Sequence, residues 1–380
     1  MSIVLLMDKS AFQALSAREH RERLFRFVEN IPPVLVREIL ADLAKTTAKG
    51  LSGDALVAML ATKFLGSGGP VNADYRSLCL ASLDGQGVPM TGQVICDEYK
   101  VDTMPDGSTA VVVDPADANL NLLRWAQGAF TAGERDVAEA LRRHARGLSR
   151  EALRGRLRKH GVLIPRANTV TDVRDIATDL LGRGSLQGPI LDWLLEQLHV
   201  SAPVAAAVLH RWELAGRPFL ASFAAYAHHC AWVLLLLLVG MTHKVFTARP
   251  TNRVDAEYLF YAPFCEVFAS GDGLHKQLAP FVLRDDQHFL WKDELKADLK
   301  RLADERDALT AHEIAQRDFA FGSRPWPARD SVLWQLWEKL RGPWKAGQGN
   351  RAALRSQDER DAAIELARRL VRDAGGIDRG

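Results

Sequence analysis

Two patterns typical of buried strands lie at opposite ends of the chain, and an acid follows each of them. The first is the apolar run Ile3–Met7, followed by Asp8; the second is Cys265–Ser270, followed by Gly271 and Asp272. Nearly continuous apolar runs of this length are typical of parallel strands covered on both faces. Open α/β sheets carry their sites at the carboxyl ends of such strands, so we expect Asp8 and Asp272 at one sheet edge.

Helical patterns follow the first strand and precede the second. Residues Ser10–Glu29 predict one helix with Ser10 as its N-cap, and Pro32-Pro33 predicts the start of the next helix. That second helix carries Glu38, and a late helical stretch, Arg253–Leu259, carries Asp255. These helices could bring two more acids to the edge where Asp8 and Asp272 lie.

The middle of the chain differs from both ends. Turn signals such as Asp84-Gly85 and Pro105-Asp106-Gly107 separate short β-like runs, including Gly92–Cys96 and Thr109–Val113, so we predict a small β element over 78–113. We predict an α/β fold whose domain has an N-terminal part at 1–48 and a C-terminal part at 251–320. A mainly helical insertion at 49–250 interrupts that domain, and a helical extension at 321–380 follows it.

One segment of the insertion has the composition of a membrane span. Residues Phe219–Met241 contain no Asp, Glu, Lys or Arg, which suits a span in length. A span here would place Asp8 and Glu38 on the opposite side of a membrane from Asp255 and Asp272. We therefore expect a buried core helix and no membrane partner.

Composition narrows the function classes only slightly. The net charge of +2 excludes a polycation, so any nucleic-acid binding must come from a local patch. The four cysteines form no C-x-x-C pair and are expected to be reduced thiols. The first residues lack the basic stretch of a signal peptide, so we expect a cytoplasmic protein. The C-terminal tryptophans, including Trp334 and Trp337, fit core packing better than stacking on bases.

Four carboxylates in one cleft would repel one another unless a divalent cation neutralised them. Hard cations prefer oxygen ligands, so Asp8, Glu38, Asp255 and Asp272 predict a Mg²⁺ or Mn²⁺ site. Ser270 could support it by hydrogen bonding to a ligand carboxylate or a bound water. Lys9, beside Asp8, could meet a phosphate, although the start of a helix is the favoured role. Taken alone, each acid would be interpreted as a helix cap or as a solvent-exposed residue. The occurrence of all four in this order favours the metal site.

The clearest basic segment is Arg142–Arg166, with nine Lys or Arg residues against the single acid Glu151. Arg150, Arg154 and Arg158 recur four residues apart, and such like-charged neighbours repel one another on a helix. A phosphate backbone would relieve the repulsion, which makes these three arginines candidate nucleic-acid ligands. A solvated helix face that pairs with acids elsewhere in the fold is an equal alternative.

At the four acids the chain resembles the PIN-domain nucleases. In that family an Asp ends the first strand, a Glu lies on an early helix after a proline, an Asp lies on a late helix, and a further Asp closes a (Ser/Thr)-x-Asp strand end. Asp8, Glu38, Asp255 and the Ser270-Gly271-Asp272 stretch match these positions. The resemblance covers about residues 1–45 and 251–300, while some 200 residues separate its halves.

The resemblance implies a PIN-like three-layer α/β/α fold and metal-dependent hydrolysis of phosphodiester bonds by an endonuclease. RNA is the expected substrate, with DNA as the second choice. The alternative is a non-catalytic PIN-like protein that binds a protein or nucleic-acid partner through the insertion and the C-terminal helices. A homo-oligomer or a partner protein remains open in either case.

Overall fold

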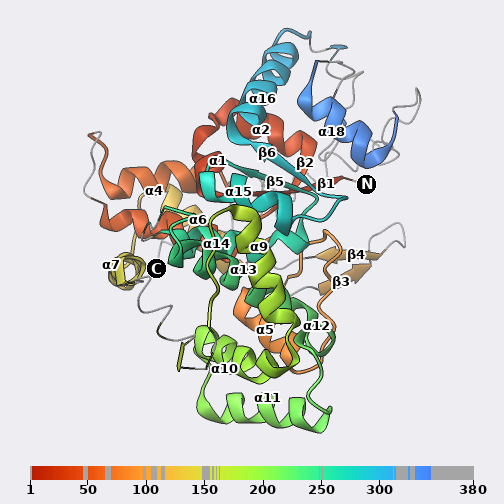
Figure 1. The fold of residues 1–380 in the computed structure, drawn as a ribbon. Helices are drawn as coiled ribbons and strands as arrows, with labels where there is room; N and C mark the ends of the chain where they lie inside the picture. Colours follow the sequence, from red (N-terminus) through yellow and green to blue (C-terminus); the bar gives the residue numbers. More distant parts are fainter. Residues whose placement is uncertain are drawn as a thin grey trace.

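The computed structural model describes most of the chain. The described residues are 2–45, 50–64, 70–96, 100–103, 109–112, 116–147, 155, 158–159, 161, 163–247, 249, 251–310, 312–313, 324–325 and 330–343. This part is mostly helical and contains one four-stranded sheet and one hairpin (Figure 1). The predicted α/β class is confirmed.

The central sheet joins the two ends of the chain. Its strands are β1 (Ile3–Met7), β2 (Phe27–Asn30), β5 (Val267–Ser270) and β6 (His288–Trp291), in the order β2-β1-β5-β6. All three pairings are parallel, and β1 lies directly beside β5. Every residue of β5 is buried, in agreement with its apolar sequence. The chain runs outward from β1 to β2 on one side and from β5 to β6 on the other, so the reversal lies between β1 and β5.

Helices cover the sheet on both sides (Figure 1). Helix α16 (Lys292–Asp307) contacts both α1 (Lys9–Ala14) and α2 (Ala17–Arg26), and all three contact strands from one side of the sheet. On the other side, α14 (Asn252–Phe260) contacts α15 (Gly273–Val282), which packs against β6. Helix α18 (Val332–Arg341) packs against α16, with Trp334 and Trp337 buried as expected of core residues.

The predicted helix over Ser10–Glu29 is wrong in two respects. It is divided between α1 and α2, because Ser16 caps a new helix and the Ser16 amide donates to Glu19 Oε2 over 2.6 Å. Its last residues form β2, which pairs with β1. A four-residue strand has little local signal, and pairing in the fold overrides the helical pattern.

The middle of the chain is helical, as expected. After β2 come α3 (Pro33–Leu40) and the 3₁₀ helix η1 (Ala41–Ala44), and Pro33 begins α3 as predicted. The further helices are α4 (Gly53–Thr62), α5 (Tyr75–Leu83), α6 (Ala116–Ala126), α7 (Ala132–Gly147), α9 (Val170–Gly182), η2 (Gly184–Leu186), α10 (Gln187–Leu198), α11 (Ala202–Leu214), α12 (Leu220–Phe223), α13 (Ala225–Thr242) and η3 (Ala262–Phe264).

The predicted β element is smaller than expected. Residues up to Leu83 belong to α5, and the expected run Gly92–Cys96 forms no strand. The described strands are β3 (Lys100–Thr103) and β4 (Thr109–Val112), which pair antiparallel. The Thr109 run is therefore confirmed over Thr109–Val112. Asp84-Gly85 follows the end of α5, whereas the predicted turn Pro105-Asp106-Gly107 lies outside the described residues.

Helix α13 occupies the interior of the fold. By length and composition it could cross a membrane, but 78% of it is buried among other elements. Tyr226 donates to the Phe260 carbonyl over 3.1 Å, and His229 Nε2 bonds the Leu259 carbonyl over 2.9 Å. These bonds tie α13 to α14, which fits the interpretation of this segment as a core helix.

Candidate active site

The two strand-end acids lie at the same edge of the sheet. Asp8 follows β1 and Asp272 follows β5, and these strands are adjacent and parallel. Each acid also caps the helix that leaves the sheet: Ala11 N donates to Asp8 Oδ1 over 2.8 Å, and Leu274 N donates to Asp272 Oδ1 over 2.7 Å. A short side chain that caps a helix is held close to its strand end, which fixes both carboxylates in place.

Asp8 is buried within a network of donors. The Ser10 hydroxyl lies 2.9 Å from both of its carboxylate oxygens, and the Ser270 hydroxyl donates to Oδ2 over 2.7 Å. His275 Nδ1 lies 3.4 Å from the same oxygen. Burial opposes ionisation of Asp8, but its bonds to His275, Ala11 and Ser270 hold its pKa below the ordinary value. Asp8 is therefore an ionised carboxylate, and Ser270 has the supporting position that was expected of it.

Glu38 reaches the site from α3. Its Oε2 accepts a hydrogen bond of 2.6 Å from the Tyr258 hydroxyl, which comes from α14. Burial raises the pKa of Glu38, and the nearby charge of Asp8 raises it further, against the opposing charge of Lys9. Asp8 and Glu38 thus lie close enough for their charges to interact, although they come from different elements.

Asp255 reaches the site from α14, and its pKa is raised. Burial raises its pKa to about 7; the charges of Asp272 and Glu38 add to the rise, and His275 opposes it. Its Oδ2 is buried and accepts no hydrogen bond from any described residue. A buried carboxylate oxygen without a donor is costly, so this atom is free to accept a cation or a proton.

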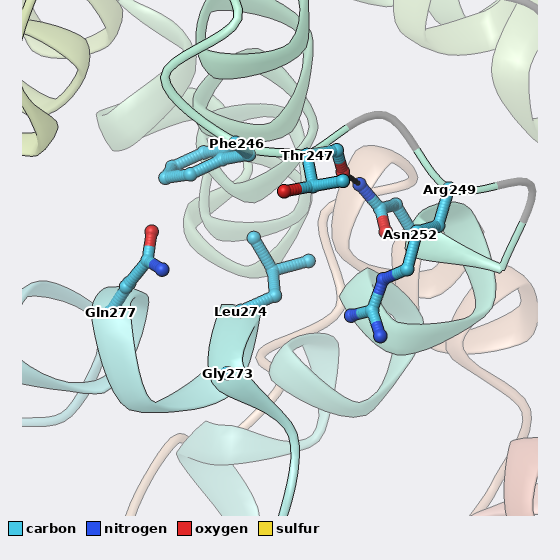
Figure 2. Close-up of a pocket in the computed structure, with 7 residues that line it drawn as sticks. All are labelled: Phe246, Thr247, Arg249, Asn252, Gly273, Leu274 and Gln277. Atoms are coloured by element: carbon cyan, nitrogen blue, oxygen red, sulfur yellow. Dashed lines mark hydrogen bonds between the residues drawn. The ribbon is translucent and has the colours of Figure 1, made fainter.

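Arg249 supplies positive charge at this end of the cluster. Its guanidinium donates to both oxygens of Asp272 over 3.0 and 2.8 Å and lies 3.9 Å from Asp255 Oδ2. Arg249 lies in the loop before α14, and Figure 2 shows its side chain extending toward the start of α15. Sequence patterns do not predict this role for Arg249, because nothing local in a loop indicates which acids an arginine will meet.

His275 is a second residue of the site that was not predicted from the sequence. It is fully buried on α15, with Nδ1 2.7 Å from the Ser270 hydroxyl and Nε2 2.7 Å from the Asp255 carbonyl oxygen. Burial opposes its protonation, but Asp8 and Asp255 raise its pKa to about 8. Its position three residues after Asp272, at the start of a helix, is a signal that could have indicated it.

Lys9 has a structural role. It is buried, it donates to the Glu38 carbonyl over 2.8 Å, and it forms an ion pair of 2.8 Å with Asp42. Burial lowers its pKa, although Asp42 and Glu38 oppose that shift. Lys9 therefore joins α1 to α3 and holds Glu38 at the site, as expected of a residue at the start of a helix.

The oxygen atoms of the four acids are the type of ligand that a hard cation prefers. All four acids offer carboxylate oxygens, and the buried Asp255 Oδ2 accepts no hydrogen bond from the described residues. Within the same part of the chain, no three His, Cys, Asp or Glu side chains stand close enough around one point to hold a metal ion. The four acids therefore lie near one edge of the sheet without surrounding a single point, and Arg249 and His275 offset part of their charge.

Only part of the predicted basic patch can be located. Arg150 and Arg154 lie outside the described residues, whereas Arg158 is exposed. The neighbouring Lys159 forms an ion pair of 2.6 Å with Glu196. The basic segment therefore pairs in part with acids of the fold.

The comparisons with known proteins add no family to these observations. Comparison of the chain with protein-family models, with curated proteins and with solved structures finds no match. The fold and the site must therefore be argued from this chain's own residues.

Proposed function

We propose that this protein is a divalent-metal-dependent nuclease that hydrolyses phosphodiester bonds, with RNA as its substrate. The observation that carries the proposal is the convergence of Asp8, Glu38, Asp255 and Asp272 from four different elements. The charges of Asp272 and Glu38 both act on Asp255 and help to raise its pKa to about 7. A fold that only needed stability would gain nothing from placing four acids where their charges repel one another.

The PIN-like three-layer α/β/α arrangement is part of the same proposal. Its support is the order of the acids along the chain and their placement: after β1, on α3, on α14 and after β5. The Ser270 hydroxyl, which binds Asp8 over 2.7 Å, fits the (Ser/Thr)-x-Asp strand end of that family. Residues 1–48 and 251–320 would then form the catalytic domain, and the helices between them an insertion.

Asp8 and Asp272 would hold Mg²⁺ or Mn²⁺, and Glu38 and Asp255 would complete its oxygen ligands. Such a cation supplies an activated water and stabilises negative charge that develops on phosphate. The other residues of the site hold the ligand carboxylates in position. Ser10, Ser270 and His275 fix Asp8, while Tyr258 fixes Glu38. Arg158 is an exposed cation that could hold a nucleic-acid strand.

A second candidate is a non-catalytic PIN-like protein that binds a protein or nucleic-acid partner. The observation in its favour is the ion pair between Arg249 and Asp272, which neutralises one acid of the cluster without a metal. In such a protein a divalent cation would change neither stability nor activity. In the nuclease, a cation would compete with Arg249 for Asp272.

The test is cleavage of single-stranded RNA and DNA of mixed sequence by the purified full chain, with Mn²⁺, Mg²⁺ or EDTA. We expect cleavage that requires the metal and that Asp8→Asn reduces at least a hundredfold. The matched control is Asp286→Asn, because Asp286 is an exposed acid paired with Arg284 away from the cluster. Absence of cleavage with either metal, or equal cleavage by wild type and Asp8→Asn, would refute the nuclease and favour the second candidate.

A further inference from the structure

We propose that Lys292 is a catalytic residue whose ammonium group binds a non-bridging oxygen of the phosphate that the acid cluster cleaves. The proposal rests on the nuclease function above and adds a direct contact with the substrate. The four acids cannot supply that contact by themselves, because their negative charge repels phosphate. Three observations support it: the place of Lys292 at the sheet edge, its packing on Gly271, and its lack of an acid partner among the described residues.

Lys292 lies at the edge of the sheet where the acids lie. It is the first residue of α16 and directly follows β6. Strand β6 runs parallel to β5, and its last residue, Trp291, is paired in register with Ser270. Asp272 lies two residues after Ser270, so Lys292 and Asp272 follow neighbouring strands at the same edge.

The side chain of Lys292 packs on Gly271, between two acids of the cluster. A Cβ atom at Gly271 would lie 2.2 Å from Lys292 Cδ and 2.7 Å from its Cε. The same Cβ would lie 2.8 Å from Ser10 Oγ, which is 2.9 Å from both carboxylate oxygens of Asp8. Because Gly271 has no side chain, the lysine can approach the hydroxyl that holds Asp8. Its ammonium group, one bond beyond Cε, is thereby brought beside the cluster.

The acids next to Lys292 on α16 are bonded to another residue. The Trp291 amide donates to Glu294 Oε2 over 3.2 Å, and the Trp291 indole donates to Asp293 Oδ2 over 3.1 Å. The side chain of Lys292 is half-buried and forms no ion pair or hydrogen bond with any residue that the structure describes. The fold therefore fixes the stem of this lysine and leaves its charge to a ligand.

The other lysines of α16 are paired. Lys296 forms an ion pair of 2.9 Å with Glu19, and Lys300 forms one of 2.9 Å with Asp304. A half-buried ammonium that has lost part of its hydration gains from an anion that binds it. Of these three lysines, the one at the sheet edge is thus the one that needs such an anion.

A phosphodiester oxygen is the anion that fits this position. An ammonium group is a compact charge with three donors and no acceptor, which suits the charged oxygens of a phosphate. The carboxylates and the ammonium lie side by side at Gly271. A phosphate held by Lys292 would therefore lie next to the acids that act on it.

The reaction leaves the protonation of Lys292 unchanged. The oxygen of a water molecule bonds to phosphorus, and the bond from phosphorus to the leaving ribose oxygen breaks. One proton of the water ends on the leaving oxygen, so the products are a phosphate monoester and a hydroxyl group. An ammonium that binds the non-bridging oxygen more strongly in the transition state raises the rate as well as the affinity.

The first measurement is binding of a short fluorescent single-stranded RNA of mixed sequence to the full chain in EDTA, by anisotropy over a range of salt concentrations. Lys292→Met keeps an unbranched apolar side chain over Gly271 and removes the charge, whereas Lys292→Arg keeps the charge. We expect Lys292→Met to weaken binding about threefold to tenfold and to lower the salt slope by about 0.7, the value for one phosphate contact. Lys292→Arg should bind within about threefold of wild type.

The second measurement is cleavage of the same RNA with saturating Mn²⁺. Lys292→Met should lower kcat about a hundredfold, which is more than its loss of affinity. Lys292→Arg should recover about tenfold of that loss, because the charge is kept while its geometry differs.

The matched control is Lys300→Met, which removes a lysine of the same helix that is already paired with Asp304. This variant should bind and cleave like wild type. No RNA binding by wild type, equal affinity and salt slope in wild type and Lys292→Met, or equal losses in both Lys292 variants would overturn the phosphate contact. Equal losses would mean that packing on Gly271, and not charge, is what matters.

The two proposals fail separately, because EDTA makes the binding measurement independent of cleavage. Weaker RNA binding by Lys292→Met, together with no cleavage by wild type, would count against the nuclease alone. Cleavage by wild type that is undiminished in Lys292→Met would count against the role of Lys292 alone.

Discussion

The Arg249 guanidinium lies 2.8 Å from Asp272 Oδ2 and 3.9 Å from Asp255 Oδ2, so one cation faces two acids of the cluster. Arg249 comes from a loop, and its side chain is 47% exposed. It can therefore leave the acids without disturbing the core. In the proposed nuclease, Arg249 and a divalent cation compete for the same carboxylates.

Arg249→Gln should accordingly raise the affinity for Mn²⁺. Ion pairs of half-exposed arginines contribute up to about 1 kcal/mol, so the gain should not exceed about fivefold. Titration of wild type and variant with Mn²⁺ measures it. Unchanged or weaker Mn²⁺ binding in the variant would show that Arg249 does not compete with a cation.

Asp255→Asn should stabilise the protein in EDTA at pH 8. Burial raises the pKa of Asp255 to about 7 in the folded protein from its ordinary value of 3.8, so the folded state holds the proton more tightly between these two pH values. The stability from this proton is fully present below about pH 4 and is lost as the pH rises through 7. Removing the charge should therefore raise the free energy of unfolding by on the order of 1–4 kcal/mol at pH 8.

Urea denaturation of wild type and Asp255→Asn, with and without Mn²⁺, measures this effect. Mn²⁺ should stabilise the wild type and have little effect on the variant, because the ligand is lost. A variant less stable than wild type in EDTA would mean that the Asp255 charge is compensated in the folded protein.

We expect the free energy of unfolding to fall in mild acid because of the buried His20. It is 3% exposed, and its Nε2 bonds the Phe12 carbonyl over 3.0 Å. Burial, together with the charges of Arg23 and Lys63, lowers its pKa to about 2 from 6.5. Below pH 6.5 His20 is therefore protonated in the unfolded chain but stays neutral in the folded protein. As the pH falls below 6.5, this group should lower the free energy of unfolding by up to about 1.4 kcal/mol per pH unit. His20→Gln should flatten the dependence between pH 6.5 and 5; equal slopes in urea denaturation would contradict this account.

Gly271→Ala should impair cleavage more than folding. A Cβ at this position would lie 2.2 Å from Lys292 Cδ and 2.8 Å from the Ser10 hydroxyl oxygen. The Ser10 hydroxyl accepts a hydrogen bond from the Gly271 amide and donates one to the Asp8 carboxylate. Displacing this hydroxyl would therefore shift Asp8. We expect cleavage to fall at least tenfold with a stability loss below about 2 kcal/mol.

The control for Gly271→Ala is Gly133→Ala on α7, where a Cβ meets no atom within 4 Å. It should keep wild-type cleavage and gain up to about 1 kcal/mol of stability from better helix propensity. If Gly271→Ala cleaved as well as Gly133→Ala, the position of Ser10 would have no bearing on the reaction.

The sequence predicts the strand-end acids because their signal is local. An apolar run that ends in an acid identifies β1 with Asp8 and β5 with Asp272, and a proline marks the start of the helix that carries Glu38. The α/β class follows from these same runs.

The rest depends on contacts between distant parts of the chain. Strand β2 was missed because its polar residues meet partners that only the fold supplies: Glu29 forms an ion pair with Arg23, and Asn30 donates to the Phe264 carbonyl over 2.9 Å. Arg249 and His275 were missed because only the fold brings them to Asp272 and Asp8.

The central claim is that the acid cluster binds a divalent cation, and Mn²⁺ binding followed by electron paramagnetic resonance tests it most directly. We predict that wild type removes the signal of free Mn²⁺ and that Asp255→Asn and Asp272→Asn each weaken the affinity at least tenfold. The exposed-acid control Asp286→Asn should bind like wild type. If wild type bound no Mn²⁺, or if both cluster variants bound it as tightly as wild type, the account of these four acids as a metal site would be wrong.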